Sequence, residues 1–233
     1  MNSTFEFEEL ISYIKQFIGK SFDEIAFELN FNSNAKSKNY LLVQKLLFNF
    51  KNKDYVDTLL KFENIIVKTI QLKINGKSKE AMSFPPIKYE KIINEEWDSS
   101  DLKCYLVKKF LFFIFKINDD GTNNLLNIIL WQMPYNDLEG EVKQTWSKTK
   151  DILLSGNVIK KFDSEGVTIS NFPTEASTNI CHVRPHGRNG LDVRKIPNTD
   201  NLTGFNSMVA YSFWFNHEYL NKIVENYKGL KGD

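Results

Sequence analysis

The chain has 233 residues, of which 42% are hydrophobic and 25% are charged, so it can bury a substantial core as one large domain or two lobes. Its formal net charge is +1, from 30 basic and 29 acidic residues. This balance excludes a histone-like polycation but allows a focused basic surface on a neutral body.

Two cysteines, Cys104 and Cys181, do not make a disulfide framework and fit a reducing cytoplasm. The most apolar run, Phe110–Phe115, is bounded by lysines and is too short to cross a bilayer. No signal peptide is visible either. We therefore expect a cytoplasmic protein without a membrane partner.

The N-terminal third is predicted to be helical. Ser3–Glu6 and Ser21–Glu24 have the spacing of capping boxes, each followed by apolar residues at helical intervals. A third helix is predicted from about Asn39 to Asn49, and a polar loop precedes it. A strand rich in β-branched residues follows, from Glu63 to Ile74.

This strand carries a pattern close to that of a metal-dependent nuclease. Because side chains alternate between faces, Ile66 and Lys68 share one side. A phosphodiesterase of the restriction-nuclease type needs a carboxylate and a lysine at this spacing, for a divalent metal and for the attacked phosphate. The lysine is present, but a hydrocarbon cannot bind magnesium. The sequence thus predicts a nuclease-shaped domain that does not cut DNA.

The remainder alternates short strands with helices. Ala81–Pro86 is predicted to be extended, and residues 110–116 and 125–131 are predicted to form a hairpin. Pro134–Ser155 is predicted to be one long helix ending at Gly156. Further strands are expected at 158–163, 181–194 and 211–216, before a final helix at 218–227. This order favours a mixed α/β (α+β) fold with two lobes.

The segment from Cys181 to Gly190 is the richest in candidate binding groups. Arginine can pair with guanine and asparagine with adenine, and glycine lets the backbone approach a groove closely. The candidate base-reading residues are Arg184, Pro185, His186, Gly187, Arg188 and Asn189. Composition alone favours an ordinary solvated loop. A zinc site from Cys181, His182 and His186 would lack the second ligand pair that such sites have.

Lysines near the predicted strand could follow DNA phosphates, or could simply keep an edge soluble. The candidates are Lys68, Lys73, Lys77 and Lys79. A relocated metal site from Asp57 and Glu63 beside Lys68 would need a bulge, because Glu63 lies at an odd offset from the lysine. The four tryptophans, Trp97, Trp131, Trp146 and Trp214, are predicted to pack inside the protein.

Motifs along nearly the whole chain resemble the MutH-like nucleases, in particular the type II restriction enzymes that recognise GATC. The motifs that carry the resemblance are Phe17–Ala26, Val67–Ile70, Ala81–Pro85, Glu95–Trp97, Lys109–Phe112, Trp131–Pro134, Trp146–Lys150 and His182–His186. The resemblance implies a restriction-endonuclease-like fold of MutH type over residues 1–233, with a mixed central sheet flanked by helices and two lobes around a DNA cleft.

The resemblance also assigns positions at which this chain departs from the family. The family's acidic residues fall at Ile66, Gln44 and Leu59, with Asp57 only nearby, and Lys68 alone is kept. Arg184–Gly187 matches the loop that reads the major groove. Ala210 stands where a lysine is expected, which puts one phosphate contact in doubt.

Some enzymes of this branch contain two such modules, of which the first cuts and the second binds another copy of the site. The resemblance implies that this chain is the second, C-terminal module: an allosteric effector of type IIE that binds double-stranded GATC DNA and acts on the catalytic N-terminal module. The domain itself would need no cofactor, and the full-length enzyme would need magnesium. Two alternatives stay open, an active magnesium endonuclease using Asp57, Glu63 and Lys68, and a protein-interaction or dimerisation module.

Overall fold

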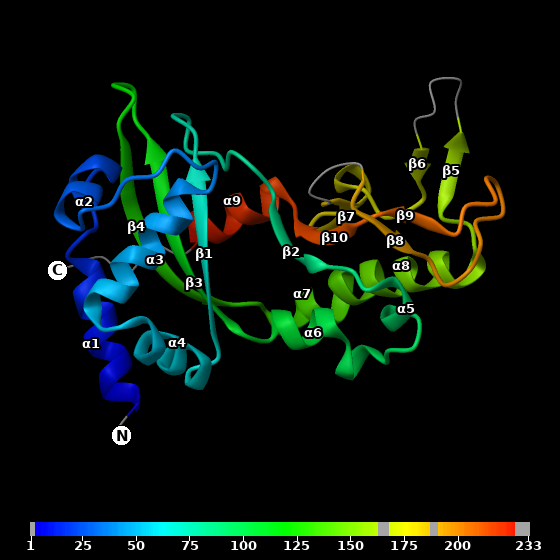
Figure 1. Ribbon diagram of the computed structural model, residues 1–233, viewed down its shortest axis with the longest axis horizontal. Helices are drawn as coiled ribbons and strands as arrows, with labels where there is room; N and C mark the ends of the chain where they lie inside the picture. The colour runs from blue at the N-terminus through cyan, green and yellow to red at the C-terminus, as the bar shows by residue number, and fades with distance from the viewer. Residues whose placement is uncertain (1–2, 163–167, 187–190, 227–233) are drawn as a thin grey trace. The chain divides into compact units, whose positions relative to one another are not determined.

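The computed structural model describes residues 3–162, 168–186 and 191–226 (Figure 1). The chain folds into two compact units, each assembled from separate stretches of sequence. Unit 1 contains Met1–Glu80, Lys108–Gln132 and Asn221–Asp233, and unit 2 contains Ala81–Val107 and Met133–Leu220. Both units combine helices with small sheets, so the predicted mixed α/β class is confirmed.

Unit 1 begins with four helices. They are α1 (Ser3–Lys15), α2 (Phe22–Glu28), α3 (Lys38–Phe50) and α4 (Lys53–Phe62). The predicted capping box starts α2: the Ser21 hydroxyl accepts from the Glu24 amide, and the Glu24 carboxylate accepts from the Ser21 amide. Helix α4 was not predicted, although Asn52 caps it by accepting from the Tyr55 amide at 3.0 Å.

A mixed three-stranded sheet completes unit 1. Strand β3 (Lys109–Ile117) lies between β1 (Ile65–Leu72) and β4 (Asn123–Gln132), parallel to the first and antiparallel to the second. The β3–β4 hairpin is the predicted one. Helices α1 to α4 cover one face of this sheet (Figure 1), and their apolar side chains form a core with Val67, Leu111 and Phe113.

Unit 2 contains the other sheets among the described residues. One has the strand order β2 (Met82–Pro86), β10 (Tyr211–Phe215), β7 (Cys181–Pro185) and is antiparallel. The other two are the pairs β5 (Ile159–Phe162) with β6 (Thr168–Ser170), and β8 (Val193–Lys195) with β9 (Ser207–Val209). The strands are thus divided among several small sheets, of which the β1–β3–β4 sheet is mixed, while β2 and the strands from β5 onward pair within unit 2.

The helices of unit 2 are short, apart from α8. They are α5 (Tyr89–Ile92), η1 (Trp97–Ser99), α6 (Asp101–Leu106), α7 (Tyr135–Asp137), η2 (Leu138–Val142), α8 (Lys143–Ser155) and η3 (Glu175–Ser177), and α9 (His217–Asn226) begins in unit 2 and ends in unit 1. The predicted continuous helix 134–155 is kinked at Gly140, whose ψ of −107° is not helical. Gly156 ends α8 as predicted, with a left-handed φ of 68°.

No helix in the described part of the chain is both long enough and apolar enough to cross a membrane.

Candidate functional site

The candidate binding residues of unit 2 lie on one face of the β2–β10–β7 sheet. Residues directly opposite each other on antiparallel strands project from the same face. His182 pairs with Trp214 and Arg184 pairs with Ser212, so these four side chains share a face. Apart from the exposed Pro185, the alternate residues of the same strands are buried: Cys181, Val183, Tyr211, Phe213 and Phe215. This sheet therefore has one hydrophobic face and one face that carries polar and aromatic groups.

The guanidinium of Arg184 lies over the indole ring of Trp214. Its Cζ atom is 3.9 Å from the ring centroid, which is the distance of a close cation–π contact. The ring of His186 meets the same indole edge-on, with centroids 4.8 Å apart. Arg184 is half-buried, whereas His186 is exposed. Trp214 thus contacts two of the residues that sequence reasoning assigned to base reading.

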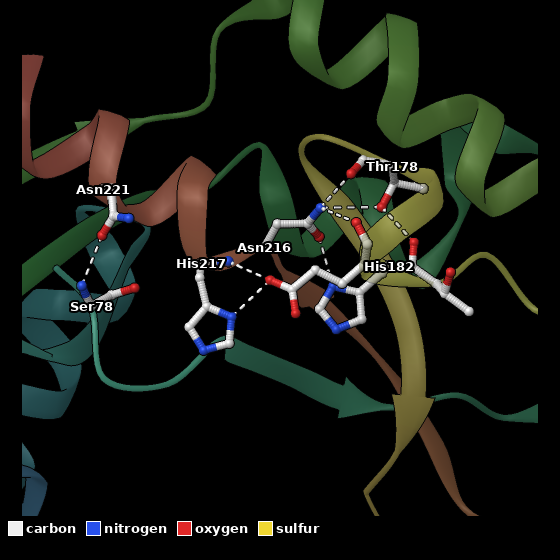
Figure 2. A network of polar contacts seen from close by, with 8 residues as sticks. Ser78, Thr178, His182, Asn216, His217 and Asn221 are labelled. Carbon is white, nitrogen blue, oxygen red and sulfur yellow. Dashed lines mark hydrogen bonds and ion pairs between the residues drawn. The ribbon is translucent and has the colours of Figure 1, made fainter.

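The N-terminal end of β7, which contains His182, is held by a hydrogen-bond network around Asn216 (Figure 2). His182 Nδ1 lies 2.6 Å from Asn216 Oδ1, and the Asn216 amide nitrogen donates to the Thr178 carbonyl at 2.8 Å. Next to it, Glu175 Oε1 accepts from both the backbone nitrogen and Nδ1 of His217 (Figure 2), at 2.8 and 2.7 Å. These bonds tie β7, the end of β10 and the start of α9 to the loop at 174–178.

The network fixes the tautomer of His182. Because the Asn216 nitrogen donates to a carbonyl, its oxygen must accept, and His182 Nδ1 must carry the proton. Nε2 of the neutral ring is then an acceptor, and it is buried without a hydrogen-bond partner among the described residues. Burial also lowers the pKa of His182, so its neutral form is favoured.

Two further buried polar atoms on this face have no hydrogen-bond partner within the part of the chain that the structure describes. They are the hydroxyl of Ser212 and the indole nitrogen of Trp214. Such atoms are uncommon in folded proteins, because each one left unpaired costs free energy. Their concentration on the face that carries Arg184 marks this face as a candidate binding surface.

The C-terminal end of β7 leads into the remaining predicted base-reading residues. Pro185 is exposed at the end of an edge strand, where its missing N–H costs no ladder bond. The His186 amide donates to the carbonyl of Ala210, the position at which a lysine was expected, at 2.8 Å. Gly187, Arg188 and Asn189 lie outside the described residues.

In unit 1, Ile66 and Lys68 are on the sheet face opposite the α1–α4 core. Their partners on β3 are Phe110 and Phe112, and both of these rings contact Trp131 on the same face. The β1–β3 register runs without a shift from residue 65 to residue 72, so β1 contains no bulge. Burial lowers the pKa of the Lys68 ammonium group. Ile66, which the resemblance places at the position of the family's acid, is thus a hydrocarbon paired with Phe110.

The other candidate acids lie outside strand β1. Glu63 was expected on the strand, but it caps the C-terminus of α4 and pairs with Lys109, Nζ to Oε2 at 3.5 Å. Asp57 is exposed on α4, while Leu59 is buried in the helical core. Gln44 is half-buried on α3. The bulge that a relocated site would need is absent from β1, and no group of three or more metal-binding side chains occurs among the described residues.

The geometry of β7 bears on the zinc alternative. Cys181 and His182 are adjacent on this strand, so their side chains point to opposite faces of the sheet. Burial raises the pKa of the Cys181 thiol, which disfavours the thiolate that zinc requires.

The predicted phosphate-binding lysines after β1 are accessible. Lys73, Lys77 and Lys79 lie at the end of this strand and in the segment that follows it, and Lys77 pairs with Glu225 at 3.2 Å. The prediction that all four tryptophans are buried is confirmed.

Sequence reasoning missed the contacts of Trp214 with Arg184 and His186, and the hydrogen bonds by which Asn216 anchors His182. The signal was the period-two pattern of residues 181–184, in which His182 and Arg184 alternate with Cys181 and Val183. Pairing the strands in register would have placed Trp214 opposite His182 and next to Arg184. The register itself could not be taken from the sequence.

Comparison with known proteins agrees with the resemblance drawn from the motifs. No protein-family model matches the chain. It is 31% identical, over 241 aligned residues and 90% of its length, to the type II restriction enzyme Sau3AI of Staphylococcus aureus. The chain is related to this restriction enzyme. The match covers 49% of the relative, so the chain spans about half the length of the curated protein that it resembles.

Proposed function

We propose that the chain is a double-stranded DNA-binding module of a GATC-specific type II restriction enzyme. Its relationship to Sau3AI over most of its length supports this, together with the Arg184–Trp214 contact on the polar face of the β2–β10–β7 sheet. That contact is the single observation on which the proposal rests most. It presents a guanidinium, the group that pairs best with guanine, at the accessible end of an edge strand.

In this proposal Arg184 and His186 contact bases, and Pro185, Gly187, Arg188 and Asn189 complete the segment that enters the major groove. Lys68 and Lys73 contact phosphates, which contribute affinity but no sequence information. The fold is of MutH type, and its two units contact the same duplex. The protein acts in the cytoplasm, where the DNA that it binds is.

We further propose that the chain is the C-terminal effector module of a type IIE enzyme. It binds one copy of GATC and thereby activates a catalytic N-terminal module, which carries the magnesium. This domain lacks a complete nuclease site of its own, because Ile66 and Leu59 replace acids and Glu63 is paired with Lys109 at the end of α4. An active endonuclease would need a cluster of metal-binding side chains, and the described residues contain no group of three or more.

Replacing Arg184 tests the assignment. Arg184→Ala should lower the ratio of affinities for a GATC duplex and a scrambled duplex by about 5- to 150-fold, because a bidentate arginine–guanine pair supplies about 1–3 kcal/mol of discrimination. Binding to the scrambled duplex should change little. The measurement is fluorescence anisotropy on both duplexes at two salt concentrations.

Arg194→Ala is the matched control, since it removes the same charge from a half-buried arginine of unit 2. It should leave the affinity ratio unchanged. Equal losses on both duplexes for Arg184→Ala would refute base reading by this residue. Absence of salt-dependent binding by the unmodified chain would instead favour the protein-interaction alternative.

A further inference from the structure

Trp214 contacts both described side chains that the proposed function assigns to base reading, and it sits in the most constrained strand of its sheet. β10 is the central strand, bonded to β7 on one side and β2 on the other, with Trp214 opposite His182 and Ser83. Only 8% of Trp214 is exposed. The ring therefore has little freedom to move away from the groups that lie on it.

The partners of the ring are anchored independently. His182, opposite Trp214, is bonded through Asn216 to the 174–178 loop, and His186 is bonded through its amide to Ala210. The Arg184 guanidinium is 3.9 Å from the ring centroid. The ammonium groups of Lys20, Lys38, Lys51, Lys103 and Lys150 lie 4.3 to 5.5 Å from the aromatic rings that they contact, so the Arg184 contact is closer than each of these.

A guanidinium that lies over an indole keeps its binding groups available. Its five N–H donors point outward in its own plane, so contact through the face leaves the fork free for a base edge. Contact with the ring also restricts the side chain before DNA arrives. Arginine otherwise loses much rotamer freedom on binding, and a side chain that is already ordered avoids that loss.

We propose that Trp214 is a specificity-determining positioning residue: its indole ring holds the Arg184 guanidinium in the orientation that reads guanine, and its edge contact holds the His186 ring beside it. This inference rests on the proposed function, since it concerns how Arg184 reads a base. It predicts that the Arg184–Trp214 contact exists in the free protein and that discrimination between sequences depends on it.

The first experiment examines the DNA-free protein, labelled with 5-fluorotryptophan, by fluorine NMR. Four resonances are expected from the four tryptophans, and Trp214→Phe identifies one of them by its loss. Arg184→Ala should shift that resonance without DNA and leave the other three in place. An unchanged Trp214 resonance would overturn the preformed contact, whether or not the chain binds DNA.

The second experiment measures the affinity ratio for GATC and scrambled duplexes. Trp214→Leu should lower this ratio about tenfold, because the ordering of Arg184 must then occur on binding. Trp214→Phe, which keeps an aromatic face, should restore much of it. In the Arg184→Ala background, Trp214→Leu should cause no further loss of discrimination. A full tenfold loss in both backgrounds would overturn the inference.

Trp146 provides the matched control for loss of a buried indole. It also belongs to unit 2, is buried, has an indole nitrogen without a partner among the described residues, and lies under a cation, Lys150. Trp146→Leu should lower the melting temperature about as much as Trp214→Leu while leaving the affinity ratio unchanged. Equal effects of both variants on the ratio would show a structural role only.

These outcomes separate the inference from the proposed function. If the unmodified chain does not distinguish the two duplexes, the proposed function fails, and the NMR result stands by itself. If Arg184→Ala removes discrimination but Trp214→Leu does not, the proposed function stands and the inference fails.

Discussion

His182 anchors the candidate binding strand β7 through its hydrogen bond to Asn216. Its Nδ1–H donates to Asn216, only 2% of the residue is exposed, and its Nε2 has no hydrogen-bond partner in the described part of the chain. Protonation would bury a positive charge near Arg184, which disfavours it, while Glu175 partly offsets this. The residue is therefore suited to a neutral state in the folded protein.

This environment predicts a stability loss in acid. Burial lowers the pKa of folded His182 below the unfolded value of about 6.5. The unfolded chain then binds a proton that the folded chain does not, so the free energy of unfolding decreases as pH falls below about 6.5 and is fully restored above it. Urea unfolding at about pH 7.5 and about pH 5.5, on either side of that value, should show a larger decrease for the unmodified chain than for His182→Gln.

His186→Gln is the control for this measurement, because His186 is exposed. It should keep the decrease seen in the unmodified chain. An identical decrease in His182→Gln would show that other groups cause the pH dependence.

At the scale of elements, the end of helix α8 illustrates how a local rule and tertiary packing act together. Gly156 adopts a left-handed φ of +68°, which glycine tolerates better than other residues. A Cβ atom there would also lie 2.8 Å from the Thr199 carbonyl oxygen. Asn201, close to the same site, donates to the Ser155 carbonyl at 3.0 Å. The loop at 199–201 is thus packed directly against the helix end.

Gly156→Ala should accordingly destabilise the protein by more than the cost of placing alanine in a left-handed backbone conformation. Gly204 has nearly the same φ, +69°, but a Cβ atom there would meet nothing within 4 Å, so Gly204→Ala measures the conformational cost by itself. That cost should be about 1–2 kcal/mol, and the clash should add about 1–3 kcal/mol. Urea unfolding of both variants gives the difference. Equal losses would show that the 199–201 loop moves aside at little cost.

For the whole molecule, the distribution of acids predicts binding without cleavage. The described residues contain no group of three or more side chains that could hold a metal ion, and Glu63, one of the candidate acids, is paired with Lys109. Affinity for a GATC duplex should therefore be the same in magnesium and in EDTA, and the duplex should remain intact in a gel assay. Weakening of binding by salt should persist in both, because phosphate contacts release counterions.

Magnesium-dependent nicking that Lys68→Met and Glu63→Gln both abolish would establish the active endonuclease instead. Nicking that survives both substitutions would locate the acids elsewhere. In either case Ile66 would no longer mark an inactive site.

The sequence by itself determined most of the elements of this protein. The helix start at Ser21, the β3–β4 hairpin, the stop at Gly156 and the placement of Ile66 and Lys68 on one face all follow from short-range rules, since caps, turns and strand alternation depend on neighbours in the chain. The motifs also led to the restriction-enzyme relationship. Errors arose where short-range signals were weak, as at α4, or where Glu63 was assigned to a strand instead of a helix end.

Only the tertiary structure decided how these elements combine. The separation into two units with several small sheets depends on which strands pair, and strand pairing joins residues far apart in sequence. The same is true of the candidate site, because Arg184 and Trp214 meet only through the β7–β10 register. Residue types can be assigned a chemistry from the sequence, but the contact that orients them forms between distant segments, and its free energy comes from packing that no local pattern encodes.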